Sequence, residues 1–259
     1  MGGAGAAAAH ESGTMPPERA ATGAPLINVQ ESAARYAFAA TEIRTLRVLD
    51  VASGTGLGSQ FLHAYGAELV VGAESDPDAL RHGVRPAPSG LSFVRADAQA
   101  LPFGDASFDA VVSFETIEHL TDARALLAEC RRVLREEGLL YLSTPNRTVT
   151  RWMPPNPFHV REFTAAELVA LVRGYFGTVT CFGQRPVFLP VFVLRQMARR
   201  WLASLPGVWR LWSRMRPRRT QLAATAWQGS HFDRSLLDER YGVRPARGQP
   251  MYTVLVARC

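Results

Sequence analysis

The chain of 259 residues contains no lysine, so all 29 of its basic residues are arginines. This absence, together with abundant alanine and glycine, indicates biased coding composition more than selection for a polyanionic partner. Ten arginines and no acidic residue lie between positions 168 and 232, which leaves 19 arginines against 23 acidic residues elsewhere. Proteins that bind nucleic acid are basic around their cleft, so the sequence argues against a nucleic-acid partner.

Cysteine is scarce, and Cys130, Cys181 and Cys259 are too far apart for a disulfide framework or a zinc-binding spacing. This favours a reducing compartment, and we predict a cytoplasmic protein. Residues 1–25 are rich in glycine, alanine and proline and lack the basic start and leucine-rich centre of a signal peptide, which predicts a disordered tail. The apolar run 186–194 is much shorter than the ~20 residues that span a bilayer.

Apolar segments typical of strands alternate along the chain with helical patterns. Strands are predicted at 47–51, 68–73, 91–95, 108–114, 138–144, 177–182 and 251–257, and helices at 57–65, 76–83, 122–135 with Thr121 as N-cap, and 165–174. Near-continuous apolar strands between helices predict an α/β fold with a parallel, doubly wound sheet covered by helices on both faces. The predicted core is formed by 26–182 and 236–259.

Residues 183–235 fit no place in that sheet and are predicted to form a helical insertion. Apolar residues recur at helical spacing on both sides of the Pro206-Gly207 break, with arginines on the other faces, which indicates two short amphipathic helices. Two interpretations stay open. The insertion is either a lid that walls the acceptor pocket or, over 186–219, a peripheral contact with a membrane surface.

The stretch VLDVASGTGLGS, residues 48–59, places glycines at every second position after an apolar run. Such a turn lets backbone pass close to a ligand, and the helix that follows attracts an anion. Glu74, at the end of the second strand, is placed to accept hydrogen bonds from ribose hydroxyls. The dinucleotide fingerprint requires glycine where Ser59 stands, and Asp50 would repel a pyrophosphate but hold an ammonium group. These residues favour an amino-acid nucleoside over NAD.

Four segments then occur in the order found in one known family: VLDVASGTG, VVGAESD, RADAQALPFGDASFDAVVSFETIEHL and RRVLREEGLLYLSTPN. Over roughly residues 30–259 the sequence resembles the class I S-adenosylmethionine-dependent methyltransferases. The resemblance implies a Rossmann-like, seven-stranded, mostly parallel sheet of order 3-2-1-4-5-7-6 with strand 7 antiparallel. It also implies S-adenosylmethionine as the cofactor.

The same resemblance implies roles for single residues. Asp97 would contact the adenine amino group, the Ala98 amide an adenine ring nitrogen, and Phe114 the methionine moiety. Arg35, in the segment ESAARYAFAA, would reach the cofactor carboxylate. The alternatives are that Asp97 only caps a turn and that Arg35 is solvated. The full predicted cofactor-binding set is Arg35, Asp50, Ser53, Gly54, Gly56, Glu74, Ser75, Asp97, Ala98 and Phe114.

The stretch FETIEHL places Glu115, Glu118 and His119 at positions that share one face of a single helical turn. His159, in NPFHVREF, is expected at the same edge of the sheet. The pattern resembles the metal motif of ubiquinone-biosynthesis O-methyltransferases and of small-RNA 2′-O-methyltransferases. One interpretation is therefore that these four residues hold a hard cation such as Mg²⁺. The other is that His119, His159 and Glu118 act as catalytic residues without metal.

We therefore expect an enzyme that methylates an oxygen of a hydroxylated small molecule, such as a natural product, a quinone precursor or a sugar. The alternatives are an RNA ribose 2′-O-methyltransferase, an NAD-dependent oxidoreductase and a protein that binds the cofactor without turnover. The partner expected is a small-molecule acceptor and no nucleic acid.

Overall fold

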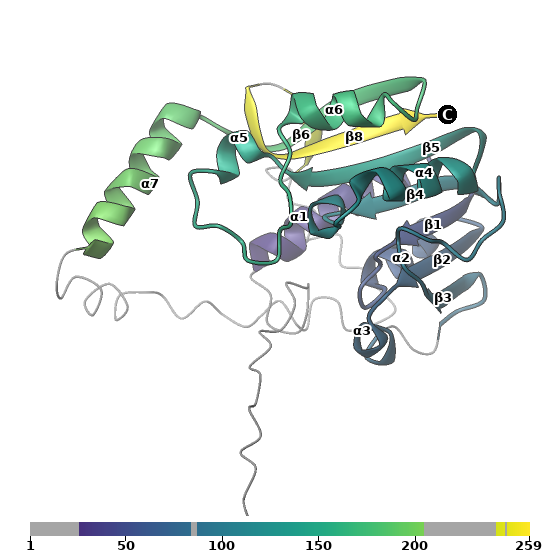
Figure 1. Ribbon diagram of the computed structural model, residues 1–259. Coiled ribbons are helices and arrows are strands. Elements are labelled where there is room, and N and C mark those ends of the chain that lie inside the picture. The colour runs from purple at the N-terminus through teal and green to yellow at the C-terminus, as the bar shows by residue number, and fades with distance from the viewer. Residues whose placement is uncertain (1–25, 84–86, 205–241, 247) are drawn as a thin grey trace, which may run out of the picture.

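The computed structural model describes residues 26–83, 87–204, 242–246 and 248–259, and their strands form a single twisted sheet (Figure 1). Its strands are β1 (Arg47–Val51), β2 (Leu69–Glu74), β3 (Leu91–Arg95), β4 (Phe108–Phe114), β5 (Leu134–Pro145), β6 (Thr178–Val187), β7 (Val243–Pro245) and β8 (Gln249–Arg258). The spatial order of the eight strands is β3-β2-β1-β4-β5-β8-β6-β7.

The sheet is mixed. Strands β3, β2, β1, β4 and β5 pair in parallel, whereas β8 is antiparallel to both β5 and β6, and β7 is antiparallel to β6. The predicted α/β class is confirmed, and the strand order implied by the resemblance is present. The count of seven strands is wrong, because β7 adds an eighth strand at the edge. This strand has three residues, too few to show the alternation that marks a strand in sequence.

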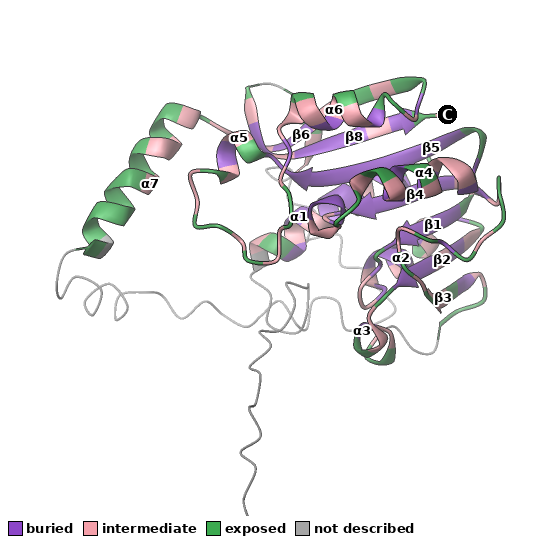
Figure 2. Ribbon diagram, viewed as in Figure 1, coloured by how far each residue is buried: buried purple, intermediate pink, exposed green. Residues whose placement is uncertain are grey.

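Helices cover both faces of the sheet (Figure 1). They are α1 (Leu26–Ala40), α2 (Leu57–Ala64), α3 (Pro77–Arg81), the 3-10 helix η1 (Ile117–His119), α4 (Ala123–Val133), α5 (Arg147–Thr150), α6 (Ala165–Val172) and α7 (Leu189–Ser204). On β1, Val48 packs with residues of α1 and α2, whereas Leu49 and Val51 pack with residues of α4 and α6. Because both faces are covered, β1, β4 and most of β5 and β8 are buried (Figure 2), which explains their near-continuous apolar sequences.

The predicted start of α6 agrees with the structure, whereas the predicted ends of α4 do not. Asp122, not Thr121, is the N-cap of α4, because its carboxylate reaches the amides of Arg124 and Ala125 at 2.9 and 3.1 Å. At the start of α6, Thr164 and Glu167 form the predicted capping box. Helix α4 ends at Val133, before the predicted residue 135, because Leu134 already pairs with β4.

The predicted insertion begins later than residue 183. Strand β6 continues through Val187, which pairs with Gln249 of β8. The first of the two expected amphipathic helices is α7, which projects away from the sheet in Figure 1 with its apolar side chains exposed. The second expected helix, after the Pro206-Gly207 break, lies outside the described residues, as does the predicted tail 1–25. Among the helices described here, none combines the length and apolarity required to cross a membrane.

Candidate functional site

The predicted site residues gather at the carboxyl ends of the parallel strands. The order of these strands reverses between β1 and β4, and ligands of doubly wound sheets bind at such a reversal. The predicted residues that end or follow these strands are Ser53, Gly54 and Gly56 after β1, Glu74 and Ser75 at β2, Asp97 and Ala98 after β3, and Phe114 and Glu115 at β4. Their contacts with a cofactor stay predictions.

The turn after β1 is built from left-handed backbone. Gly54 has φ +58° and Gly56 has φ +80°, and the amide of Gly56 donates to the carbonyl of Ser53 at 3.0 Å. A Cβ added at Gly54 would meet nothing within 4 Å, whereas one added at Gly56 would lie 2.3 Å from the ring of Phe93. The turn therefore leaves open space beside Gly54 and is closed at Gly56 by the protein itself.

Asp50 supports this turn from beneath. Its carboxylate is fully buried and accepts hydrogen bonds from the Ser59 hydroxyl at 2.6 Å and the Tyr36 hydroxyl at 3.1 Å. Burial raises the pKa of Asp50 to about 7, although both hydrogen bonds act in the opposite direction. Tyr36 was not predicted from the sequence as part of this site. Its ring occupies the space beside Gly58, where an added Cβ would lie 1.9 Å from the ring.

Glu74 ties the ends of β1 and β2 together. Its two carboxylate oxygens accept from the amides of Gly54 at 2.8 Å and Asp76 at 2.9 Å. A carboxylate oxygen has two lone pairs, so these bonds leave acceptor capacity for ribose hydroxyls. Asp97 is exposed and caps its turn by accepting from the Gln99 amide at 2.9 Å. Turn capping is therefore one role of Asp97, and its contact with adenine stays a prediction.

Arg35 is buried, with 5% of its surface exposed, so the solvated alternative is wrong. Its Nη1 donates to Gln184 Oε1 at 2.7 Å, and its guanidinium lies 4.9 Å from the ring centre of Tyr252. These contacts join α1 to strands β6 and β8 and place a permanent positive charge inside the protein.

Some buried polar atoms here lack a protein hydrogen-bond partner. Among the described residues these include the Ser53 hydroxyl, Arg35 Nε and Glu118 Oε1. Buried polar atoms are rarely left unpaired, and such exceptions often mark a ligand or water position. Together with the open space at Gly54, these atoms fit a site for a polar ligand that carries a carboxylate and hydroxyl groups.

A second cluster follows β4. Ligand atoms of Glu118, His119 and His159 lie within 4.8 Å of one another, and the two imidazole ring centres are 5.0 Å apart. The loop after β5 brings His159 to this place, because the amides of Val160 and Arg161 donate to the carbonyl of Glu118 at 2.8 and 3.1 Å. The sequence prediction that His159 joins Glu118 and His119 at one edge is confirmed.

Glu115 does not join this cluster, so the predicted single helical turn over Glu115, Glu118 and His119 is wrong. Glu115 has φ +53° directly after β4, and only Ile117–His119 form a helical turn. The carboxylate of Glu115 accepts from the Ser143 hydroxyl at 2.7 Å on β5. The chain leaves the strand through a left-handed residue, which breaks the helical spacing assumed from the sequence.

Hydrogen bonds fix the tautomer of His119. Its Nδ1 lies 3.0 Å from the carbonyl oxygen of Phe158, which can only accept, so Nδ1 carries the proton. In the neutral ring the lone pair therefore resides on Nε2, the atom that can take a proton or bind a metal. For His159, Nδ1 contacts Glu162 at 2.7 Å and Nε2 contacts the Asn156 amide nitrogen at 2.9 Å.

The sequence analysis missed Asn156 and Glu162 as partners of His159. Both are present in NPFHVREF at three residues before and three after the histidine. That regular spacing was the available signal, because a tight loop brings residues three apart together.

Comparisons with known proteins agree with this geometry. Residues 49–142, from β1 into β5, match the family model described as a methyltransferase domain. A probable S-adenosylmethionine-dependent methyltransferase from Mycobacterium tuberculosis is 40% identical over 139 residues, covering 52% of this chain and 50% of that protein. This chain carries a class I methyltransferase domain. The cofactor implied for this domain is S-adenosylmethionine.

A ubiquinone biosynthesis O-methyltransferase from Cereibacter sphaeroides is 34% identical to the domain over 145 residues, covering 49% of this chain and 58% of that protein. The chain thus spans about half the length of the curated relatives that it matches. Among solved structures, an S-adenosylmethionine-dependent methyltransferase from Mesorhizobium loti has a TM-score of 0.55 at 16% identity, covering 90% of this chain and 100% of that chain. The cyclase SpnF has a TM-score of 0.53 at 20% identity, covering 87% and 81%. These likenesses show the fold alone.

Glu118 is the most deeply buried member of the second cluster. Burial, followed by the charge of Glu115, raises its pKa well above the usual range, although Thr144 donates a hydrogen bond to it at 2.9 Å. These surroundings therefore favour the neutral, protonated form of the Glu118 carboxyl.

The cluster is a poor match for Mg²⁺. That ion prefers oxygen ligands, whereas the described cluster offers one carboxyl and two imidazoles, since Glu115 is bonded elsewhere. Two imidazoles with one carboxylate suit a softer transition metal better. The expected Mg²⁺ site over Glu115, Glu118, His119 and His159 is therefore not supported.

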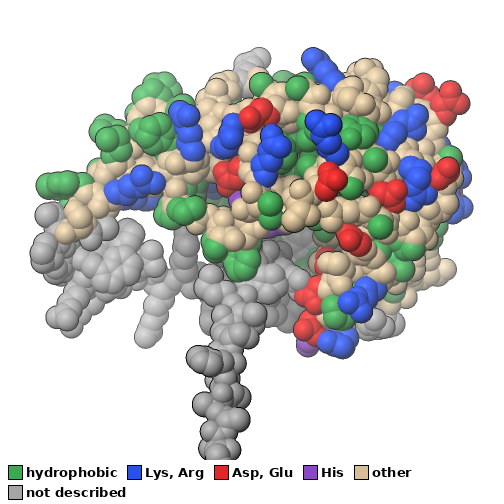
Figure 3. Space-filling model, in the orientation of Figure 1, with side chains coloured by type: hydrophobic (Ala, Val, Ile, Leu, Met, Phe, Trp, Pro, Cys, Tyr) green, Lys and Arg blue, Asp and Glu red, His purple; other side chains and the backbone are tan. Residues whose placement is uncertain are grey.

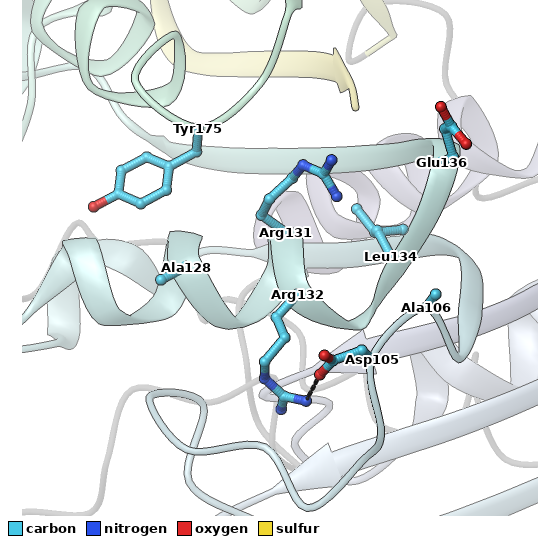
Figure 4. A pocket seen from close by; sticks show the side chains of 8 residues that line it. All are labelled: Asp105, Ala106, Ala128, Arg131, Arg132, Leu134, Glu136 and Tyr175. Atoms are coloured by element: carbon cyan, nitrogen blue, oxygen red, sulfur yellow. Dashed lines mark hydrogen bonds and ion pairs between the residues drawn. The ribbon is translucent and has the colours of Figure 1, made fainter.

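A shallow hollow elsewhere on the domain is lined by residues that include Asp105, Arg131, Arg132 and Tyr175 (Figure 4). It lies where α4 ends and β5 begins, and Arg132 pairs there with Asp105 at 2.9 Å. The start of β5 is at the sheet edge opposite to the candidate site, so the hollow is separate from it.

Proposed function

We propose that the methyltransferase domain methylates a hydroxyl oxygen of a small molecule such as a natural product, a quinone precursor or a sugar. The observation that carries this proposal is the convergence of His119, His159 and Glu118 at the carboxyl end of β4, beside the glycine turn after β1. A hydroxyl is a weak nucleophile and must lose its proton when it is methylated, so an oxygen acceptor needs a base at this position.

His119 is the proposed base. Its Nδ1 proton is held by the Phe158 carbonyl, so Nε2 has the lone pair that accepts the hydroxyl proton. His159, held between Glu162 and Asn156, is the proposed positioning partner whose ring packs edge-on against His119. S-adenosylmethionine, when bound, supplies an activated methyl group, so the protein has only to align the acceptor and take its proton.

The proposed cofactor site is formed by the residues that end or follow β1 and β2, together with Arg35. Glu74 would accept from the ribose hydroxyls, and the backbone at Gly54 would lie beneath the ligand. Arg35, whose Nε lacks a partner among the described residues, is the proposed contact for the cofactor carboxylate. Asp97, Ala98, Ser75 and Phe114 keep their proposed places around the adenine and the methionine chain.

The test is methyl transfer from isotopically labelled S-adenosylmethionine to catechols, hydroxylated quinone precursors, sugars and total RNA in parallel. The proposal predicts O-methylated small molecules, identified by mass spectrometry and NMR, and no label in RNA. Label confined to RNA would favour the ribose alternative, and N- or C-methylated products would contradict a hydroxyl acceptor.

The same assay distinguishes base catalysis from metal catalysis. We expect activity to persist in EDTA and to be lost in His119→Gln, because the lone pair of His119 is the proposed proton acceptor. Loss of activity in EDTA, with recovery on adding Mn²⁺ or Mg²⁺, would instead assign the cluster to a cation.

A further inference from the structure

Helix α7 presents an apolar face that no described part of the chain covers. Leu194, Met197 and Trp201 are 68%, 58% and 64% exposed, and Val191 and Leu202 are also exposed. Figure 2 shows the helix as mostly exposed, and Figure 3 shows hydrophobic side chains gathered over it. Soluble proteins rarely leave a contiguous surface of this kind open without a partner.

The exposed apolar residues form one stripe along the helix. At 3.6 residues per turn they fall within an arc of about 140° that contains no charged residue. The opposite side is half-buried toward the rest of the chain. We call the exposed stripe the apolar arc of α7, and its members are Pro190, Val191, Leu194, Met197, Ala198, Trp201 and Leu202.

Arginines lie beyond both edges of the apolar arc, and the nearest of them, Arg195, follows the edge formed by Leu202. By the same helical geometry, Arg195 lies about 20° and Arg199 about 60° beyond the edge formed by Leu202. Arg200 lies about 60° beyond the edge formed by Met197, on the side of the helix that faces the rest of the chain. Long cationic side chains at the edges of an apolar helix face can extend to phosphate groups while their stems cover apolar surface. The stretch 168–232 carries ten arginines and no acidic residue, so the complementary surface is anionic.

We propose that α7 binds to the surface of an anionic membrane, with the apolar arc in the acyl chains and Arg195 and Arg199 at the lipid phosphates. A lipid surface fits better than an acidic protein, because the arc is apolar along its whole length and only its edges are charged. At 16 residues the helix lies in the interface and does not span it.

The helix also contacts the part of the chain that carries His159. Arg200 Nη2 lies 3.4 Å from the carbonyl oxygens of both Trp152 and Met153, at the start of the loop that continues to His159. A membrane bound by α7 would therefore lie near the acceptor side of the candidate site. The binding itself does not depend on what the site methylates.

The test is flotation of the full chain with vesicles of phosphatidylcholine alone or mixed with phosphatidylglycerol, at low and high salt. We expect binding to the mixed vesicles at low salt, and affinity lower by about tenfold or more at high salt or without the anionic lipid. Arg195→Gln/Arg199→Gln should weaken binding to mixed vesicles by a similar factor.

The apolar arc is tested by Leu194→Glu, which should reduce binding by about tenfold or more because it places a charge among acyl chains. Gln196→Glu adds the same charge to the half-buried side of the helix and is the matched control, expected to bind within about threefold of the wild type. Circular dichroism melting curves check that each variant folds.

Failure of the wild type to bind mixed vesicles, or wild-type binding by Leu194→Glu, would overturn the proposal. Light scattering after gel filtration tests the alternative that a second copy of the chain binds to the apolar arc. A wild-type dimer that Leu194→Glu converts to a monomer, without vesicle binding by either, would show that a second copy of the chain covers the arc and would also overturn the proposal.

Discussion

The hydroxyl of Ser59 donates a 2.6 Å hydrogen bond to the buried carboxylate of Asp50, which joins the first turn of α2 to β1 beneath the glycine turn. Ser59 is the residue that separates this turn from a dinucleotide fingerprint, and here it has a structural role in place of the missing glycine. The bond and the Tyr36 hydroxyl are the polar contacts that Asp50 receives in an otherwise apolar setting. These two hydroxyls therefore hold the Asp50 carboxylate in place beneath the turn.

Asp50→Asn should change the dependence of stability on pH. Burial raises the folded-state pKa of Asp50 from 3.8 to about 7, so the folded protein binds this proton more tightly than the unfolded chain. The stabilisation is present at low pH and is lost as pH rises from about 4 to about 7. Asparagine has the same shape, accepts from Ser59 and cannot ionise.

Denaturant unfolding of both proteins between pH 5 and pH 8, without added cofactor, measures this effect. The free energy of unfolding of the wild type should fall relative to that of Asp50→Asn by roughly 2–4 kcal/mol as pH rises. Groups such as Glu118 titrate in both proteins, so they cancel in the difference. Parallel pH curves for the two proteins would show that Asp50 does not titrate in this range.

The two glycines of the turn should respond differently to alanine. Gly54→Ala should fold, with a loss of stability of about 1–2 kcal/mol from its left-handed backbone, but should lose cofactor affinity by tenfold or more, since its Cβ enters the open space. Gly56→Ala should be less stable, because its Cβ would lie 2.3 Å from the Phe93 ring. Thermal unfolding and calorimetric titration with S-adenosylhomocysteine measure the two effects.

Phe93→Ala provides the control for Gly56. Removing the ring should restore part of the stability that Gly56→Ala loses, so the double variant should be more stable than the sum of the two single changes predicts. Additive losses would show that Phe93 is not what excludes a side chain at position 56.

These contacts show which part of the turn the sequence could predict. The glycine spacing predicted a tight turn at the end of β1, because left-handed backbone is adopted by glycine at the lowest steric cost. It could not show that Phe93 and Tyr36 are the reason for Gly56 and Gly58, because their rings come from β3 and α1, far away in sequence. Glycine is required both where a ligand lies against the backbone and where an aromatic ring packs against it. The sequence pattern therefore cannot distinguish the two cases.

Glu162→Gln should slow methyl transfer without changing cofactor affinity. The Glu162 carboxylate contacts His159 Nδ1 at 2.7 Å and so fixes the ring that packs against His119. We expect kcat lower by about tenfold or more with an unchanged dissociation constant for S-adenosylhomocysteine, since only the acceptor side is disturbed. The exposed Glu136→Gln removes the same charge near the distant hollow and should leave both quantities unchanged. An unchanged kcat in Glu162→Gln would exclude this positioning role.

Glu118→Gln should leave the fold and cofactor binding intact. Burial and the charge of Glu115 raise the pKa of Glu118, so a neutral amide resembles the form that the site favours. The free energy of unfolding near pH 7 should change by less than about 1 kcal/mol, or increase, because no buried charge is removed. A large loss of stability, measured by denaturant unfolding, would show that the ionised carboxylate is what the fold requires.

In the second cluster, helical spacing alone did not predict correctly which side chains lie together. Glu118 and His119 were placed together correctly because they are neighbours, and His159 because loops after parallel strands meet at one edge. Glu115 was misplaced because nothing in its sequence shows that the chain leaves β4 through a left-handed residue. The eighth strand was missed for a similar reason, since three residues carry no detectable period.

The most direct test of the account is calorimetric titration of the wild-type protein with S-adenosylhomocysteine and with NAD⁺. The open space at Gly54, the free acceptor capacity of Glu74 and the buried cation of Arg35 fit an amino-acid nucleoside, and Asp50 and Ser59 depart from a dinucleotide site. We expect saturable binding of S-adenosylhomocysteine and no heat of binding for NAD⁺. Binding of NAD⁺ with no binding of S-adenosylhomocysteine would contradict it.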